Sequence, residues 1–274
     1  METSHRTIVV TGATSGIGKT AAQFLASRNV HLIVQGPERA EDARSLVIDL
    51  EARGARAVTY ISSDFSSLDD VSSAAQSILE TAGSIDVLVN NAGIPGADRR
   101  RMTPDGHERT LQVNYLAMVL LTELLLPALH PSGKIINLSS TTHRTTHLHM
   151  NDLNLSAGYS PVTAYAHSKL AILTYSLWLA RELEDTGINV VSISPGVIST
   201  SLLHSMFGSG GATLAHGAQR VIEAIDGTYP SGTYIDDGVP VTPSTEARDP
   251  NSQNALMAAT RDLLAGHAKP TPHR

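Results

Sequence analysis

The chain of 274 residues contains no cysteine. Disulfide bonds, thiol nucleophiles and thiolate metal sites are therefore excluded, and a reducing compartment such as the cytoplasm is expected. Blocks of like charge are also missing, because the longest basic run is the three arginines at residues 99–101. Together with a formal net charge of -6, this balance argues against nucleic acid as a partner and favours a small-molecule substrate.

Long hydrophobic runs are scarce as well. The most apolar stretch, residues 115–129, is too short and too interrupted to predict a membrane-spanning helix. A strand-like pattern begins at Thr7, so we expect no signal peptide ahead of it and a soluble protein without a membrane partner. No repeat or long linker divides the chain, which predicts one domain over residues 1–268 and a proline-containing, disordered tail over residues 269–274.

Short β-branched runs alternate with longer amphipathic segments through most of the chain. Strands are predicted at residues 7–11, 31–35, 57–62, 86–90, 134–139, 189–194 and 233–236. Helices are predicted between them, for example at residues 18–28, 40–53, 68–82, 104–129 and 164–185. Apolar strands that are separated by helices indicate a parallel sheet covered on both faces. The expected fold class is α/β, with a doubly wound sheet of about seven strands.

A glycine-rich turn, TGATSGIGKT, follows the first predicted strand and opens the first helix. Free N–H groups at a helix N-terminus bind anions such as a dinucleotide pyrophosphate, and glycine lets the backbone approach the phosphates closely. The spacing G-x-x-x-G-x-G differs from the commonest dinucleotide fingerprint, and a purely structural turn is the alternative. The candidate dinucleotide-binding residues in this turn are Gly12, Thr14, Ser15, Gly16, Ile17 and Gly18.

Further polar and turn residues follow other predicted strands at their carboxyl ends. The motif NNAG ends the strand at 86–90, INLSS ends the strand at 134–139, and SPGVIST follows the sixth strand. Ligands bind at that edge of an open parallel sheet, so we expect these groups to share one site. Tyr165 and Lys169 lie four residues apart on one face of a predicted helix. For an isolated pair, the ordinary explanation is a lysine that reaches solvent beside an amphipathic tyrosine.

Taken together, these motifs resemble the short-chain dehydrogenase/reductase family. The resemblance covers residues 6–265 and rests on the glycine turn, Asn-Asn-Ala-Gly, Tyr-x-x-x-Lys and Pro-Gly-x-x-x-Thr. Ser140 precedes Tyr165 by 25 residues, which is similar to the retinol-dehydrogenase-like branch, although no membrane anchor is expected here. The resemblance implies a Rossmann-type fold and an NAD(P)-dependent oxidoreductase that interconverts a small-molecule ketone or aldehyde and its alcohol.

The tyrosine and the lysine would supply acid–base chemistry. A free tyrosine titrates near pH ~10, and a neighbouring ammonium stabilises the phenolate, so we expect Lys169 to lower the pKa of Tyr165. Tyr165 then acts as general acid in carbonyl reduction and as general base in alcohol oxidation. Ser140 is expected to donate a hydrogen bond to the substrate oxygen as negative charge develops there. By resemblance, Lys169 also binds the nicotinamide ribose.

The resemblance implies further roles. Asn114 in VNYLA is expected to support a water-mediated proton path to Lys169, the alternative being a polar residue that merely kinks a buried helix. Thr200 is expected to hold the nicotinamide carboxamide. Asp64 is expected either to contact the adenine ring or, equally, to cap a helix. The remaining residues expected to contact the dinucleotide are Asn91, Ala92, Gly93, Tyr165, Lys169, Pro195 and Gly196.

The choice between NADP(H) and NAD(H) depends on the residues after the second predicted strand. Members of the family that prefer NAD usually place an acid at the end of that strand, where it accepts a hydrogen bond from the ribose 2′-hydroxyl. Here the segment reads Gln35-Gly36-Pro37-Glu38-Arg39, and Arg39 is placed to reach a 2′-phosphate. NADP(H) is therefore favoured over NAD(H), and Glu38 is the argument against it.

Substrate contacts are expected from three residues near the active serine or after the sixth strand, namely Thr142, His143 and Phe207. His147 and His149 alternate in the loop after Ser140, a spacing that could bind a metal ion. No carboxylate or cysteine completes a convincing ligand set, and the reaction needs no metal, so none is predicted.

The favoured function is an NADP(H)-preferring carbonyl reductase or alcohol dehydrogenase. A reductase of a carrier-bound keto group is the enzymatic alternative, and a dinucleotide-binding redox sensor or scaffold is the non-enzymatic one. The presence of both Tyr165 and Lys169 favours an enzyme. A homodimer or homotetramer is expected to pair through the helices at 104–129 and 164–185, although burial against the sheet would give these helices the same apolar pattern.

Overall fold

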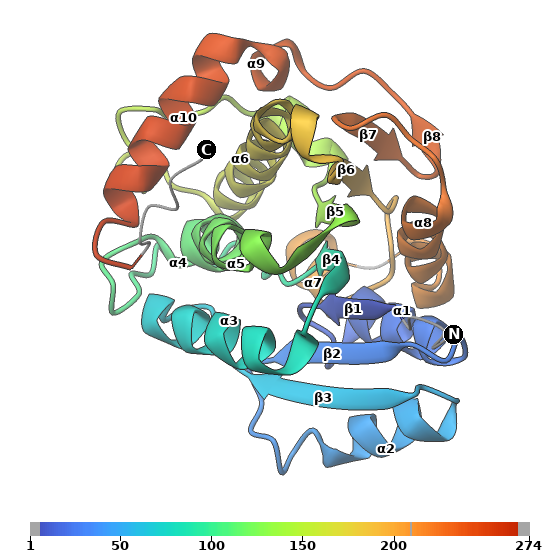
Figure 1. The fold of residues 1–274 in the computed structure, drawn as a ribbon. Helices are drawn as coiled ribbons and strands as arrows, with labels where there is room; N and C mark the ends of the chain where they lie inside the picture. The colour runs from blue at the N-terminus through green and yellow to red at the C-terminus, as the bar shows by residue number, and fades with distance from the viewer. Residues whose placement is uncertain (1–5, 209, 268–274) are drawn as a thin grey trace.

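The computed structural model describes residues 6–208 and 210–267, without the side chain of Phe207. The tail predicted at 269–274 lies outside the described residues. Figure 1 shows one twisted sheet with helices on both sides, and its strand order is β3-β2-β1-β4-β5-β6-β7-β8. The strands are β1 Thr7–Val10, β2 His31–Gly36, β3 Ala57–Ser62, β4 Ile85–Asn90, β5 Leu129–Leu138, β6 Asn189–Ser194, β7 Thr233–Asp236 and β8 Val239–Pro240.

The sheet is parallel from β3 to β7, and only the two-residue strand β8 runs antiparallel, to β7. The predicted Rossmann-type, doubly wound parallel sheet is therefore confirmed, with an eighth strand that was not expected. A strand of two residues has too few side chains to give a hydrophobic pattern, so its pairing depends on the turn before it. The strand order reverses between β1 and β4, which is where open α/β sheets bind ligands.

The helices cover the sheet in two layers, each with its own hydrophobic core (Figure 1). Helices α1, α2 and α8 pack on one face, and α3, α5 and α6 pack on the other, with α10 outside α6. Both faces of β1 and β4 are buried, which explains their continuous apolar sequence. The helices are α1 Gly16–Ala26, α2 Arg44–Ala52, α3 Leu68–Ala82, α4 Arg109–Leu111, α5 Ala117–Leu125, α6 Pro161–Glu182, α7 Ser201–Phe207, α8 Leu214–Asp226, α9 Thr245–Arg248 and α10 Pro250–Leu263.

The helix predicted at 104–129 begins later, at Arg109, because Glu108 caps it. The Glu108 carboxylate accepts hydrogen bonds from the N–H groups of Thr110 and Leu111, at 2.9 and 2.7 Å. A π-helical turn, Gln112–Leu116, joins α4 to α5. The helical run Arg109–Ala128 is long and apolar enough to cross a membrane, contrary to the expectation from sequence, but 72% of its most apolar window is buried inside the fold.

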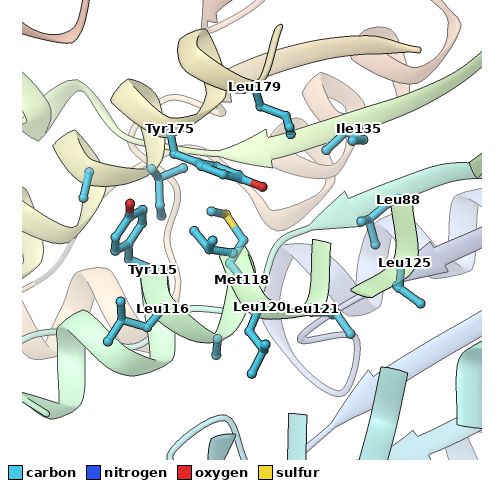
Figure 2. Packing of buried hydrophobic residues seen from close by; sticks show 14 of the residues in the cluster. Leu88, Tyr115, Leu116, Met118, Leu120, Leu121, Leu125, Ile135, Tyr175 and Leu179 are labelled. Carbon is cyan, nitrogen blue, oxygen red and sulfur yellow. The ribbon is translucent and has the colours of Figure 1, made fainter. Parts of the chain in front are cut away.

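Figure 2 shows how this run contributes to the core. Tyr115 and Met118 lie near Tyr175 of α6, and Leu125 lies near Leu88 of β4. The rings of Tyr115 and Tyr175 meet edge to face, with their centroids 6.4 Å apart. The run is thus the central helix of one layer and holds the loop after β4 in place.

Helices α9 and α10 pack against α6, one of the two helices through which a second copy was expected to pair. The Tyr115 hydroxyl is hydrogen-bonded to Thr260 of α10 at 2.7 Å, and the Arg261 guanidinium lies 5.5 Å from the ring centroid of Trp178. The chain's own C-terminal helices therefore cover part of α6. This contact explains why α6 is apolar on almost all sides.

Candidate active site

A cavity of about 890 Å³ opens along the carboxyl ends of β1 to β6. Its floor is formed by the glycine turn after β1 and by the loop after β4, and its far wall is formed by the segment after β6 and by α7. Sequence analysis placed the candidate residues at this same edge. The predicted residues that line the cavity are Gly12, Thr14, Ser15, Gly16, Ile17, Asp64, Asn91, Ala92, Gly93, Ser140, Thr142, Tyr165, Lys169, Pro195, Gly196 and Thr200.

The glycine turn has the backbone geometry that an anion site requires. Gly12 and Gly16 have φ angles of +63° and +56°, which side chains other than glycine rarely adopt. Helix α1 begins here, and the side chain of its N-cap residue, Ser15, does not bond to the free N–H groups of the first turn. Those N–H groups remain available for a phosphate.

Gly18 has a different role from the one expected, because it does not line the cavity. A Cβ atom at this position would lie 2.3 Å from both Asn91 Nδ2 and the Gly12 carbonyl oxygen. Asn91 Nδ2 in turn donates hydrogen bonds to the carbonyls of Thr11 and Gly12, at 2.8 and 3.1 Å. Gly18 therefore allows α1 to pack closely behind the turn, and Asn91 fixes the shape of the turn.

Ser140, Tyr165 and Lys169 come together at the end of β5. The Ser140 hydroxyl and the Tyr165 phenol share a side-chain hydrogen bond. Lys169 lies one helical turn beyond Tyr165, with Nζ 5.5 Å from the phenol ring centroid, and donates a hydrogen bond to the carbonyl of Leu138 at 2.8 Å. Only 9% of Tyr165 and 4% of Lys169 are exposed, so the explanation of a lysine reaching solvent is wrong.

The pKa of Tyr165 changes in the direction opposite to the one predicted. Burial raises the pKa of Tyr165 to about 12, and the hydrogen bond from Ser140 opposes this only in part. Burial also lowers the pKa of Lys169 to about 8. Loss of hydration destabilises the phenolate by more free energy than the hydrogen bond with Ser140 stabilises it. The phenol therefore keeps its proton at neutral pH.

Asn114 lies in the π-helical turn, where the regular helical hydrogen bonds are shifted. Its Oδ1 accepts from the N–H of Ile94 at 2.7 Å, and its Nδ2 donates to the Ile94 carbonyl and to Ser168 Oγ, at 3.0 and 2.9 Å. These bonds join the loop after β4 to α6. Gly93 lies between Asn114 and Lys169, since a Cβ there would be 3.5 Å from Asn114 Oδ1 and 3.6 Å from Lys169 Nζ.

Two acidic residues line the cavity beyond β2 and β3, namely Glu38 and Asp64. Asp64 accepts a hydrogen bond from the N–H of Ser66 at 2.9 Å, whereas Ser67 caps α3, so the alternative of a helix cap at Asp64 is wrong. Arg39 does not line the cavity. Its side chain is 81% exposed and pairs with Glu41 at 3.0 Å. The structure thus brings Glu38, and not Arg39, into the site.

A family model described as short chain dehydrogenase matches residues 6–208, which include the glycine turn, Ser140, Tyr165 and Lys169. The chain belongs to the short-chain dehydrogenase/reductase family. The human polyprenol dehydrogenase is 35% identical over 211 residues, which cover 74% of this chain and 63% of that protein. The human retinol dehydrogenase 12 is 32% identical over 275 residues, which cover 94% of this chain and 86% of that protein.

A solved structure of an uncharacterised protein from Mycobacterium paratuberculosis superposes with a TM-score of 0.78 at 28% identity, covering 94% of this chain and 92% of that one. Some similar solved structures hold NADP. The predicted likeness to the retinol-dehydrogenase-like branch is confirmed by the relatives. The chain nevertheless spans less than two thirds of the polyprenol dehydrogenase it matches.

The residues predicted to contact a substrate differ in part from the prediction in their placement. Thr142 lines the cavity, but His143 is fully buried beneath it, so its predicted pocket role is wrong. His143 Nδ1 donates to the carbonyl of Ser140 at 2.7 Å, and its ring packs edge to face on Tyr234. Burial lowers the pKa of His143, which keeps the ring neutral. The predicted contact of Phe207 lies outside the described side chains.

Helix α7 forms part of the cavity wall, and of its residues only Phe207 was predicted from the sequence as a substrate contact. Val197, Leu202 and Leu203 line the cavity, and Thr200 both lines it and caps α7 by accepting from the N–H of Leu203 at 3.1 Å. The apolar spacing in VISTSLLHSMF was the available signal, but it also fits ordinary helix packing. Among the described residues, no group of three His, Asp or Glu side chains is arranged to bind a metal ion.

Proposed function

We propose that this chain is a carbonyl reductase or alcohol dehydrogenase that uses a nicotinamide dinucleotide, with Tyr165 as the proton donor and acceptor. The observation that carries the proposal is the cluster of Tyr165, Ser140 and Lys169, which opens into the same cavity as the glycine turn. The turn fits a dinucleotide, because its positive φ glycines and uncapped helix N-terminus leave backbone N–H groups facing the cavity.

In this mechanism the protein orients the substrate and moves one proton. When bound, the dinucleotide supplies the hydride or accepts it in the reverse direction. Ser140 donates a hydrogen bond to the substrate carbonyl oxygen, and Tyr165 gives that oxygen its proton as negative charge develops. A pKa of about 12 means that Tyr165 carries its proton at neutral pH. Lys169 would hold the ribose of the nicotinamide half and keep a positive charge beside the phenol.

We further propose that the substrate is an apolar aldehyde, ketone or alcohol. The part of the cavity wall after β6 carries Val197, Leu202 and Leu203, whose side chains offer no charge to a polar substrate. The names of the two human relatives, polyprenol and retinol dehydrogenase, also indicate apolar alcohols. A carrier-bound keto group is the less favoured alternative, since no described feature of the wall is specific for a carrier.

The direct test follows the absorbance of NADH and NADPH in the presence of the full chain and a panel of carbonyl compounds. The panel contains apolar aldehydes and ketones of increasing chain length, polar aldehydes of matched size, and one carrier-bound ketoacyl substrate. Turnover that rises with apolar chain length supports the proposal. Turnover only with the carrier-bound substrate supports the alternative enzyme, and dinucleotide binding without any turnover supports the sensor or scaffold.

The cofactor preference is the second part of the proposal. The sequence favoured NADP(H) because of Arg39, and some similar solved structures hold NADP. The contacts favour NAD(H), because the Glu38 carboxylate lines the cavity while Arg39 pairs with Glu41 on the surface. A carboxylate accepts a hydrogen bond from a ribose 2′-hydroxyl and repels a 2′-phosphate.

We therefore expect the variant E38Q to shift the ratio of kcat/KM for NADPH over NADH upward by about tenfold, equivalent to about 1.4 kcal/mol. The variant R39A is the matched control on the neighbouring residue, and it should leave the ratio unchanged. A wild-type preference for NADPH that is lost in R39A would show that the prediction from sequence was right and that this proposal is wrong.

A further inference from the structure

The turn between β7 and β8 carries a strained residue that the proposed mechanism does not use. Asp237 has a φ angle of +44°, in the left-handed region where residues other than glycine are uncommon. The turn is held on one side by the Asp237 N–H, which donates to the carbonyl of Ser194 at 2.9 Å. Strain of this kind persists only where surrounding contacts fix it, so its partners indicate its role.

One set of partners comes from the beginning of α8. His216 Nε2 lies 2.6 Å from Asp237 Oδ1, and Arg220 Nε, one turn later, lies 3.4 Å from the same oxygen. The Arg220 guanidinium also lies against Gly238, where a Cβ atom would come within 2.2 Å of it. The carboxylate of Asp237 therefore ties the turn to the first two turns of α8.

On its other side, Asp237 lies against Gly196, a residue of the cavity lining. Gly196, which lines the cavity, has a φ angle of +88°, and a Cβ atom there would lie 3.2 to 3.5 Å from the carboxylate atoms of Asp237. Asp237 thus lies directly behind the Pro195-Gly196 turn. No larger residue would fit at Gly196 without displacing the carboxylate.

Helix α7 is attached to the fold by two short segments that lead to these same partners. The outgoing segment starts at Gly196, and the returning segment runs into α8. The two are bonded to each other, since the N–H of Ser199 donates to the Ala212 carbonyl and the N–H of Ala212 donates to the Val197 carbonyl, both at 2.8 Å. Asp237 thus contacts the start of the outgoing segment at Gly196 and, through His216, the first turn of α8, into which the returning segment runs.

We propose that Asp237 is a positioning residue that fixes α7 as the substrate-facing wall of the cavity. Through Gly196 it sets where the outgoing segment leaves β6, and through His216 it sets where the returning segment joins α8. Its catalytic consequence rests on the proposed function: without the carboxylate, α7 moves and substrate affinity falls while proton transfer at Tyr165 is unaffected.

The test separates the effect of the carboxylate contacts of Asp237 from the effect of its left-handed backbone conformation. Amide hydrogen exchange of residues 197–208 and 210–216 is measured in the full chain for the wild type and for D237A, D237G and D237N. Glycine relieves the strained φ but removes the carboxylate, so D237G and D237A should both accelerate exchange by about tenfold, the factor that one charge-assisted hydrogen bond carries. Asparagine enters the left-handed region as readily as aspartate and keeps one acceptor, so D237N should restore part of the protection.

The matched control is D226N, which breaks the ion pair between Arg28 and Asp226 at the other end of α8 and should leave this exchange unchanged. In turnover assays, D237G should raise the KM for an apolar carbonyl about tenfold with kcat nearly unchanged. Wild-type exchange rates or a wild-type KM in D237G would overturn the proposal. If the wild type turns over no carbonyl compound, the proposed function fails, while the exchange experiment still decides the role of Asp237.

Discussion

Replacing Tyr165 with phenylalanine should lower kcat by about 10²- to 10⁴-fold, the usual contribution of a positioned general acid. The phenol is buried, bonded to Ser140 and protonated at neutral pH, so it is the group best placed to give a proton to a carbonyl oxygen. Phenylalanine keeps the ring and its packing, and the dissociation constant for the dinucleotide should change little. Steady-state turnover and dinucleotide fluorescence titration measure the two quantities separately.

The matched control is the neighbouring phenol of Tyr159, whose hydroxyl donates to the carbonyl of Ala97 at 2.8 Å. Y159F removes a hydroxyl from a tyrosine just ahead of α6 but outside the cavity, and it should keep turnover within about threefold of the wild type. Full turnover in Y165F, with dinucleotide still bound, would contradict the assignment of the proton donor.

Most of the fold was predictable because its signals are local. The parallel strands other than β5 are short runs rich in β-branched residues, whereas β5 begins at Leu129, ahead of the strand predicted at 134–139, because Pro131 and Gly133 give that stretch no strand signal. Helix α3 was predicted at the bounds it has, Leu68–Ala82, since its apolar spacing is regular. The start of α4 was not predictable from periodicity. It depends on Glu108, which is buried and caps the helix four residues after the proline that marked the expected start. Glutamate is not among the preferred N-cap residues, so a cap at this position has no strong sequence signal.

The sequence predicted which residues form the candidate site, but it did not predict the direction in which the pKa of Tyr165 shifts. Motif spacing placed Ser140, Tyr165 and Lys169 at one edge of the sheet, as they are found. The sign of the Tyr165 pKa shift depends on how much water reaches the phenol, and that is a property of packing by distant segments. The same reason accounts for His143, a polar loop residue in the sequence that lies beneath Ser140 in the fold.

Arg39 and Glu38 show a further limit, since adjacent residues in a loop have side chains on different sides. From the sequence alone, the side chains of Glu38 and Arg39 are expected in the same place. The conformation of the backbone decides which of the two side chains enters the cavity. Here the hydroxyls of Tyr60 and Ser62 both donate to the Glu38 carbonyl, at 2.7 and 2.8 Å, and fix that part of the loop. Both donors belong to β3, and the sequence of the loop gives no sign that β3 will hold it in this way.

Replacing Lys169 with methionine should remove most of the turnover and, at the same time, change how stability depends on pH. Burial lowers the pKa of Lys169 from 10.5 to about 8, so the folded chain binds this proton more weakly than the unfolded chain. Between those two values the unfolded state holds more protons, and the free energy of unfolding of the wild type rises with pH. Below about pH 8 the buried charge destabilises the fold by about 3 kcal/mol.

The variant K169M lacks this titration. Its free energy of unfolding relative to the wild type should therefore fall by about 3 kcal/mol between pH 7 and about pH 11, whatever constant offset arises from the lost bond to Leu138. Urea unfolding of both proteins at a series of pH values measures this difference in the free energy of unfolding. K134M is a second test of the same argument, because burial also lowers the pKa of Lys134, so its free energy of unfolding relative to the wild type should change with pH in the same direction. A difference between K169M and the wild type that does not vary with pH would mean that Lys169 is not held as a buried cation, and the charge beside Tyr165 would then have to come from elsewhere.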